Sequence, residues 1–175
     1  MLFRRNKSPA AAGSRQAPLT TAATDTPAHA APPQKILVAD DDPVALGALS
    51  LKLKSKGYRV VTASDGSQAL SATRTERPDL MLLDVNFPPD VGGVPWNGFS
   101  LTQWLARDDH AKKIPVILIS ASDKPEYQKR ASEVGAAAFL PKTIATEGLL
   151  ACIDLALRQN AGSAPAKPPG NAFAI

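Results

Sequence analysis

Four short apolar runs in this sequence each end in polar residues that can take part in phosphoryl or acid–base chemistry. These residues are Asp40-Asp41-Asp42, Asp84, Ser120 and Lys142. Apolar runs of this length are typical of buried strands in a parallel sheet, and the carboxyl ends of such strands lie at one edge. We therefore expect the four polar groups to meet in one crevice.

The residue types indicate what chemistry such a crevice could support. Neighbouring carboxylates repel one another and raise each other's pKa unless a cation lies between them. A few oxygen ligands on a rigid scaffold suit Mg²⁺, which retains several waters and also binds phosphate oxygens. A carboxylate can be the nucleophile in phosphoryl transfer, for which a metal ion, a lysine and a hydroxyl donor supply neutralisation and positioning. The set predicts Mg²⁺-dependent formation of an aspartyl phosphate.

Taken one at a time, these residues have simpler interpretations. Asp42 precedes Pro43, a pair typical of a helix cap and first turn rather than of a metal ligand. A serine after a strand is usually a turn residue, and a single lysine is usually solvated. The coincidence of polar groups with four strand ends favours a shared site over these separate interpretations.

Alternating strands and helices are predicted to position these groups. Apolar runs predict strands at 35–39, 58–63, 80–83, 116–119 and 137–140. Helical stretches separate them, the first from Asp42-Pro43 to Gly57 and the last over 146–159. Strict alternation predicts an α/β fold with a doubly wound, five-stranded parallel sheet and helices on both faces.

The charge of the chain is concentrated outside this alternating region. The net charge is +4, of which residues 1–34 carry +3 and residues 161–175 carry +1, so residues 35–160 are neutral. Both flanks are rich in Ala and Pro and lack a hydrophobic period, so we expect a disordered basic tail at 1–34, a folded domain at 35–160 and a disordered tail at 161–175. A neutral domain with basic tails argues against a nucleic-acid partner or a membrane surface.

The remaining composition favours a reducing compartment. Cys152 is the one cysteine in the sequence, which excludes an internal disulfide. No apolar run reaches the length of a membrane span, and the N-terminus has no apolar segment typical of a secretion signal. We expect a cytoplasmic protein without a membrane partner.

The residues at the strand ends resemble the receiver domains of bacterial response regulators, over about residues 35–160. The stretches that carry the resemblance are KILVADDDP, PDLMLLD, IPVILISA and VGAAAFLPK. Their order and spacing are similar to the family's acidic cluster, phosphoacceptor, hydroxyl residue and lysine. The resemblance implies a chemotaxis-regulator-like single-domain receiver with flavodoxin-like strand order 2-1-3-4-5.

The resemblance also implies residue roles. Asp84 would accept the phosphoryl group, and Lys142 would pair with the phosphoryl oxygens. Mg²⁺ would be held by oxygens of four residues, Asp41 more directly and Asp40 partly through water; these residues are Asp40, Asp41, Asp84 and Asn86, the last through its backbone carbonyl. The Ser120 hydroxyl would move toward the phosphoryl group and Phe139, at the position of the family's switch aromatic, would follow, although Phe139 can equally be a core aromatic.

Two departures from the family pattern concern loops. The family usually has proline after the lysine, in a cis peptide, whereas here Thr143 follows, so that loop is either trans or reshaped. The glycine that opens the next helix, Gly98, comes fourteen positions after Asp84, about six more than usual, which places an insertion within 90–96. Trp96 in that insertion either folds back on Phe99 or Trp104 or forms a contact surface.

Two alternative functions stay open at this point. In a haloacid-dehalogenase-type phosphohydrolase, Asp40 and Asp42 would form the first motif; it would leave Asp84 without a role and lacks a later acidic pair at a strand end. A receiver-like module that binds partners independently of phosphate would keep the fold without the chemistry.

The resemblance further implies the partners. A histidine kinase or phosphotransfer protein would supply the phosphoryl group, and an unidentified downstream protein would read the result on a face formed by the last helices and strand. The protein would not be an enzyme beyond its own phosphorylation and the hydrolysis of its aspartyl phosphate. Neither flank is expected to hold a DNA-binding or catalytic output domain, so output by protein contact or along a phosphorelay is predicted.

Overall fold

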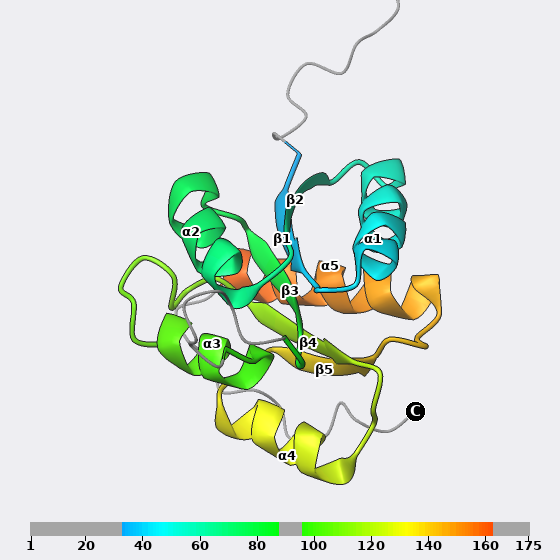
Figure 1. The fold of residues 1–175 in the computed structure, drawn as a ribbon. Helices are drawn as coiled ribbons and strands as arrows, with labels where there is room; N and C mark the ends of the chain where they lie inside the picture. The colour runs from blue at the N-terminus through cyan, green and yellow to red at the C-terminus, as the bar shows by residue number, and fades with distance from the viewer. Residues whose placement is uncertain (1–32, 88–95, 163–175) are drawn as a thin grey trace, which may run out of the picture. The chain divides into compact units, whose positions relative to one another are not determined.

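Residues 33–87 and 96–162 are described by a computed structural model, in which strands and helices alternate along the chain (Figure 1). The predicted disordered tails fall outside these residues, apart from 33–34 and 161–162. The predicted insertion at 90–96 also falls outside them, apart from Trp96.

The described strands form one parallel sheet. The strands are β1 (Lys35–Ala39), β2 (Arg59–Ala63), β3 (Leu80–Asp84), β4 (Val116–Ser120) and β5 (Ala138–Pro141). Their order across the sheet is β2-β1-β3-β4-β5, and every pairing is parallel. This confirms the predicted doubly wound fold and its strand order. It also puts β1 and β3 side by side at the centre, where the order of connection reverses.

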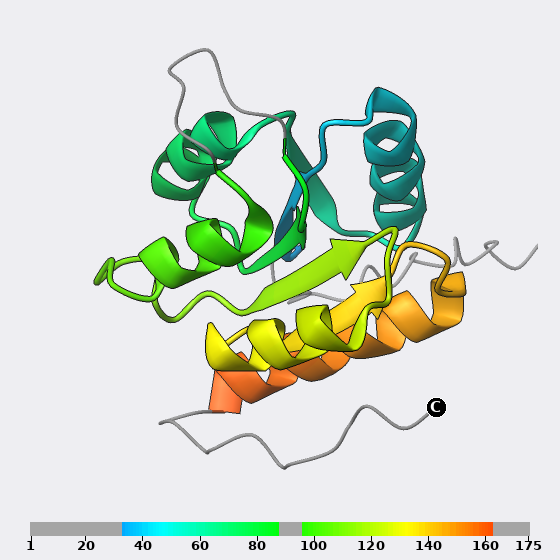
Figure 2. The ribbon, with the colours of Figure 1, turned by 60° about the horizontal axis from the view of Figure 1, so that its bottom comes forward.

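The helices cover both faces of the sheet (Figures 1 and 2). They are α1 (Pro43–Ser55), α2 (Gly66–Glu76), α3 (Gly98–Leu105), α4 (Pro125–Glu133) and α5 (Thr146–Gly162). One core cluster joins Ile36 and Leu82 to residues of α1 and α5, and the other joins Leu37 and Leu83 to residues of α2, α3 and α4. Successive residues of a strand point to opposite faces, so burial on both faces explains why the strands are continuous apolar runs.

Side-chain caps fix the start of three helices close to strand ends. Asp42 accepts a hydrogen bond from Val44 N at 2.8 Å, and Pro43 occupies the first helical turn, as predicted. Asp65 caps α2 through Gln68 N at 2.7 Å. Asn97 and Ser100 form a capping box at α3, each side chain accepting from the other's backbone N–H. These caps make the carboxyl edge of the sheet a set of short, defined turns.

Element ends differ from the predicted ones by a few residues. Tyr58 belongs to the turn that ends α1, because its N–H donates to Leu53 O and Gly57 adopts a left-handed φ of 89°. The strand therefore begins at Arg59. The last helix extends to Gly162, beyond the predicted end at 159, because no glycine or proline occurs between Leu149 and Ala161. Within 33–87 and 96–162, no helix is both long and apolar enough to cross a membrane.

Candidate functional site

Three aspartates from two adjacent strand ends form an acidic cluster. Asp40 and Asp41 directly follow β1, and Asp84 is the last residue of β3, the neighbour of β1 in the sheet. One carboxylate oxygen from each residue lies within 4.8 Å of the other two. Asp40 is fully buried and Asp84 is nearly so, whereas Asp41 is exposed. The cluster therefore has one side open to solvent, at Asp41.

Lys142 extends from the end of β5 to both buried carboxylates. Its Nζ lies 2.6 Å from Asp84 Oδ2 and 2.8 Å from Asp40 Oδ2. The contact with Asp84 has the geometry of a hydrogen bond. The contact with Asp40 is an ion pair only, and Asp40 Oδ2 is buried without a hydrogen-bond partner among the described residues. The lysine thus leaves part of the hydrogen-bonding capacity of Asp40 unused.

The same local turn occurs at three of the strand ends. The side-chain oxygen of the terminal polar residue accepts the backbone N–H two residues later, at 3.0 Å for Asp40, 3.2 Å for Asp84 and 3.1 Å for Ser120. Such turns are a common preference of Asp and Ser after strands. Each turn holds one oxygen of the side chain against the backbone, so the second oxygen of Asp40 and of Asp84 faces Lys142.

Burial and charge shift the protonation of the two groups that share the shortest contact. Burial raises the pKa of Asp84 above its usual value and the charge of Asp40 adds to this, while Lys142 and the Asn86 N–H act in the opposite direction. Burial alone would lower the pKa of the Lys142 ammonium, but its contacts with Asp40 and Asp84 outweigh burial and raise it. Lys142 is therefore held as a cation, whereas burial opposes the ionisation of Asp84.

The donor set fits a small divalent cation. Three carboxyl groups face one ammonium group, so the cluster has more potential negative charge than Lys142 can balance. Carboxylate oxygens on a rigid scaffold with one open side are what Mg²⁺ requires, since it keeps part of its water shell. The Asp40 Oδ2 atom, which has an ion pair with Lys142 but no further donor among the described residues, and the exposure of Asp41 agree with such a ligand.

The other residues named from the sequence lie at or near the cluster. Ser120 is fully buried at the end of β4, and its carbonyl accepts the N–H of Lys142 at 2.7 Å. Asn86 is exposed, and its N–H is the donor to Asp84. Phe139 is buried at 3% exposure in β5. The roles assigned to these residues, including the carbonyl ligand of Asn86 and the switch at Ser120 and Phe139, stay predictions.

Thr143 does not impose an unusual backbone. No cis peptide bond occurs within 33–87 and 96–162, so the bond between Lys142 and Thr143 is trans. The turn closes through Ile144 N, which donates to Pro141 O at 3.0 Å. Of the two possibilities that the missing proline allows, the trans loop is the one adopted.

Aromatic contacts beside the site were not foreseen from the sequence. Tyr127 makes edge-to-face contacts with Phe99 of α3 and Phe139 of β5, at centroid distances of 5.6 and 6.4 Å. The spacing of Tyr127 and Ala131 indicates one helix face, but the aromatic partners depend on how α4 packs across the sheet. Phe139 thus takes part in an aromatic group that connects α3, α4 and β5.

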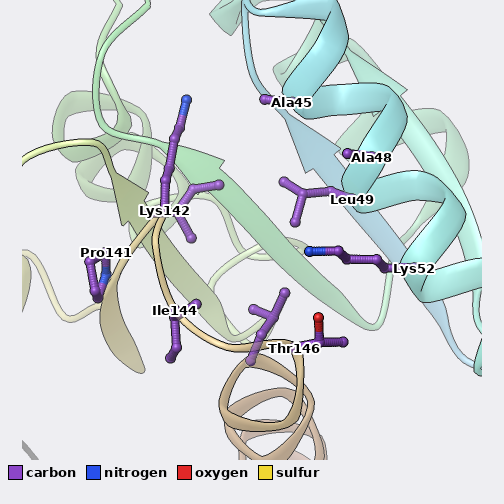
Figure 3. A pocket seen from close by; sticks show the side chains of 10 residues that line it. Ala45, Ala48, Leu49, Lys52, Pro141, Lys142, Ile144 and Thr146 are labelled. Atoms are coloured by element: carbon purple, nitrogen blue, oxygen red, sulfur yellow. The ribbon is translucent and has the colours of Figure 1, made fainter.

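An apolar pocket of about 130 Å³ lies next to Lys142, between α1 and the chain that follows β5 (Figure 3). Leu49 of α1 and Ile144 face each other across it, and Lys52 extends into it from α1 (Figure 3). The Lys142 side chain points away from it (Figure 3). Two further apolar residues of α1, Val44 and Leu51, are 77% and 73% exposed. The helix beside the acidic cluster therefore has apolar groups on its outer side as well as against the core.

Known proteins share both the sequence pattern and the fold. Residues 36–154 match the family model of the response regulator receiver domain. Protein PilH of Pseudomonas aeruginosa is 32% identical over 123 residues, covering 70% of this chain and 97% of PilH. Transcriptional regulatory protein KdpE of Mycobacterium tuberculosis is 34% identical over 134 residues, covering 77% of this chain but 55% of KdpE. The chain thus spans about half the length of that relative.

Solved structures agree with this similarity. Chemotaxis protein CheY4 of Vibrio cholerae superposes with a TM-score of 0.64 at 29% identity, covering 71% of this chain and 98% of CheY4. The BeF₃-activated receiver domain of RstA from Klebsiella pneumoniae gives a TM-score of 0.63 at 28% identity, covering 72% of this chain and all of that domain. The chain belongs to the response regulator receiver domain family.

Family membership defines the class of function. The chain is a receiver domain of two-component signalling, and receiver domains are signalling modules that interact with histidine kinases or phosphotransfer proteins and with downstream targets. The dehalogenase-type alternative is not supported. Its first motif requires Asp42 as a catalytic group, but the Asp42 side chain caps α1 and is not part of the acidic cluster.

Proposed function

We propose that Asp84 accepts a phosphoryl group from the phosphohistidine of a histidine kinase or phosphotransfer protein. The observation that carries this proposal is the contact of 2.6 Å between Asp84 Oδ2 and Lys142 Nζ inside the acidic cluster. In the transfer, the P–N bond of the phosphohistidine breaks as a P–O bond forms to an Asp84 carboxylate oxygen, and the histidine, already protonated on its other ring nitrogen, leaves as neutral imidazole.

Mg²⁺ would be held by the carboxylates of Asp40, Asp41 and Asp84 and by the Asn86 carbonyl, with Asp41 as the more direct ligand and Asp40 acting partly through water. When bound, the metal supplies positive charge that the cluster lacks. The exposure of Asp41 and the spare acceptor capacity of the buried Asp40 carboxylate beside Lys142 support this assignment.

Lys142 and Ser120 would act on the transferred group. The Lys142 ammonium, now between two carboxylates, would pair with phosphoryl oxygens once Asp84 is modified, since those oxygens carry more negative charge than the carboxylate. The Ser120 hydroxyl would reorient toward the same oxygens. Phe139 would follow it, and the change would reach the face of α4, β5 and α5 where a downstream protein binds.

The surface beside the site supports a protein phosphodonor. Helix α1 carries two exposed apolar side chains, Val44 and Leu51, and lines part of the neighbouring apolar pocket. The first turn of α1 is adjacent to the acidic cluster. Apolar groups of this kind favour contact with another protein. The single thiol, Cys152, is compatible with action in the reducing cytoplasm.

Labelling with a small phosphodonor tests the proposal. Acetyl phosphate or phosphoramidate should label the wild-type protein on one residue in the presence of Mg²⁺, and the label should be absent with a chelator or in Asp84→Asn. Asp42→Asn is a matched control, because asparagine also caps helices and Asp42 lies outside the cluster. This variant should be labelled like the wild type.

The alternatives give different results in the same experiment. Absence of label in the wild type would contradict the phosphoacceptor assignment and favour a phosphate-independent interaction module. Steady turnover of many phosphate esters that needs Asp40 and Asp42 but not Asp84 would favour a hydrolase.

A further inference from the structure

The first residues of α2 and α3 are glycines that have no room for a side chain. A Cβ at Gly66 would overlap Trp96, lying 2.6 Å from its Cγ as well as against its Cβ. Among the described glycines only Gly57 and Gly135 have positive φ, so Gly66 is not required by its backbone conformation. Glycine is needed at position 66 because the Trp96 side chain occupies the space that any larger side chain there would take.

Gly98 makes an equally close approach to the phosphoacceptor strand. A Cβ at Gly98 would meet the carbonyl oxygen of Asp84 and would lie 3.0 Å from Val85 Cα. The Gly98 N–H donates to Val85 O at 2.9 Å. The start of α3 is therefore packed directly on the backbone that carries Asp84 and leads to Asn86.

Between these two contacts the chain is short and held by hydrogen bonds. Trp96 is separated from Gly98 by Asn97, the residue of the capping box with Ser100. Trp96 is partly buried and packs on the core cluster that includes Val85 and Phe99. The segment 96–98 thus contacts α2 at one end and the backbone of the Asp84 turn at the other. The contact of Trp96 with Gly66 was not among those expected from the sequence.

We propose that Trp96 is a positioning residue for the phosphoacceptor site. Its packing on Gly66 fixes segment 96–98 and, through Gly98, the backbone of Asp84 to Asn86, on which the Asp84 carboxylate and the Asn86 carbonyl depend. This inference rests on the proposed function of Asp84 and on its Mg²⁺ site. It gives a role to the large, partly buried aromatic side chain at the end of an unusually long connection.

The test measures Mg²⁺ affinity and phosphorylation, together with stability. Trp96→Ala should weaken Mg²⁺ binding about tenfold, at the low end of the effect of residues that support metal ligands, and should slow labelling by acetyl phosphate in the same proportion below saturating Mg²⁺. Mg²⁺ affinity is read from the metal-dependent rise in melting temperature, a measurement that does not depend on phosphorylation.

Trp104→Ala is a matched control. Trp104 is the second tryptophan of the chain and lies near the end of α3, where Arg74 of α2 covers its ring at 4.9 Å. This variant also removes an aromatic contact between α2 and α3, but not at position 66. It should lower the melting temperature without changing Mg²⁺ affinity.

A double-mutant cycle separates positioning from a general loss of packing. Gly66→Ala should weaken Mg²⁺ binding in the wild type because it displaces Trp96. In the Trp96→Ala background the same change should leave Mg²⁺ affinity unaltered and raise the melting temperature, since alanine suits a helix better than glycine. Equal effects of Gly66→Ala in both backgrounds, or wild-type Mg²⁺ affinity in Trp96→Ala, would overturn the inference. If the wild type neither binds Mg²⁺ nor is labelled, the proposed function falls and this inference falls with it.

Discussion

Carboxyl groups are paired with donors differently at the two ends of the sheet. At the amino ends of the strands, the Lys35 ammonium donates to the Glu76 carboxylate at 3.1 Å and to its carbonyl at 2.6 Å, while the Lys35 N–H donates to Asp79 at 2.7 Å. At the carboxyl ends, the buried carboxyl groups of Asp40 and Asp84 share the ammonium of Lys142, and the exposed carboxyl group of Asp41 lies close to both. At the amino ends each carboxylate has its own donor and the contacts are partly exposed, whereas at the carboxyl ends two buried carboxylates depend on one ammonium.

This difference indicates which end is shaped by stability and which by chemistry. Ion pairs near the surface, such as the one at Lys35, contribute up to about 1 kcal/mol. Buried carboxyl groups without sufficient counter-charge cost free energy instead, and such arrangements concentrate at functional sites. The excess of carboxyl groups at the carboxyl ends is therefore best explained by a cation that the site binds.

Removing the Lys142 ammonium is expected to have the largest effect on the site at the carboxyl ends of the strands. Lys142→Met should slow labelling of Asp84 by about 10²-fold, the range reported for the loss of one charge-stabilising donor. Without Mg²⁺ it should also lower the free energy of unfolding by about 1–3 kcal/mol, less than for a fully buried pair, because Lys142 is partly exposed. Labelling kinetics and urea unfolding measure the two effects.

Lys52→Met is a suitable control for that experiment. Lys52 lines the neighbouring pocket, and no ion pair connects it to a carboxylate within the described part of the chain. A loss of labelling as large as that of Lys142→Met would show that general charge near the site, and not the contact with Asp84, determines the rate.

Binding of Mg²⁺ to the acidic cluster should stabilise the folded protein. At a Mg²⁺ concentration ten times the dissociation constant, the free energy of unfolding should rise by about 1.4 kcal/mol. Asp84→Asn should reduce this gain, because it removes one carboxylate from the cluster. Thermal unfolding over a series of Mg²⁺ concentrations measures it, with K⁺ at equal ionic strength as the control. A gain that is the same with K⁺ would mean screening and not a metal site.

The acidic cluster should also give a pH dependence without Mg²⁺. Because burial raises the pKa of Asp84 above 3.8, the folded protein keeps this proton over a pH range in which the unfolded chain has lost it. The contribution of Asp84 to the free energy of unfolding is therefore greatest below pH 3.8 and is lost as the pH rises through the folded pKa. The difference in unfolding free energy between Asp84→Asn and wild type should grow as the pH rises from 3.8 through the folded pKa, and a constant difference would contradict the raised pKa.

The smallest effect is expected at the amino ends. Lys35→Met should cost about 1 kcal/mol or less and should leave both Mg²⁺ affinity and labelling unchanged, because the ion pair with Glu76 is partly exposed and belongs to no other site. Urea unfolding and the labelling assay test this together. A change in Mg²⁺ affinity would mean that the two ends of the sheet are coupled.

The fold and the centre of the site could be predicted because both depend on local patterns. Strands buried on both faces are visible as apolar runs, and Asp42 with Pro43 indicates a helix start from neighbouring residues alone. The positions of Asp40, Asp84 and Lys142 followed from the rule that strand ends meet at one edge. The packing of Trp96 on Gly66 joins residues thirty positions apart and depends on the angle between α2 and α3, which no local pattern contains. The contacts of Tyr127 were missed for the same reason.

The helix α4 has fewer buried residues than the other four described helices. Its buried set is Ala131 alone, and no side chain caps its first turn, where Lys124 stands. Local opening of a segment requires free energy in proportion to the buried contacts it loses, so α4 should be the helix with the lowest cost of transient opening and the fastest amide hydrogen exchange. If Phe139 has the proposed switch role, its contact with Tyr127 would act on the part of the domain where a small free energy is enough to change the population of conformations.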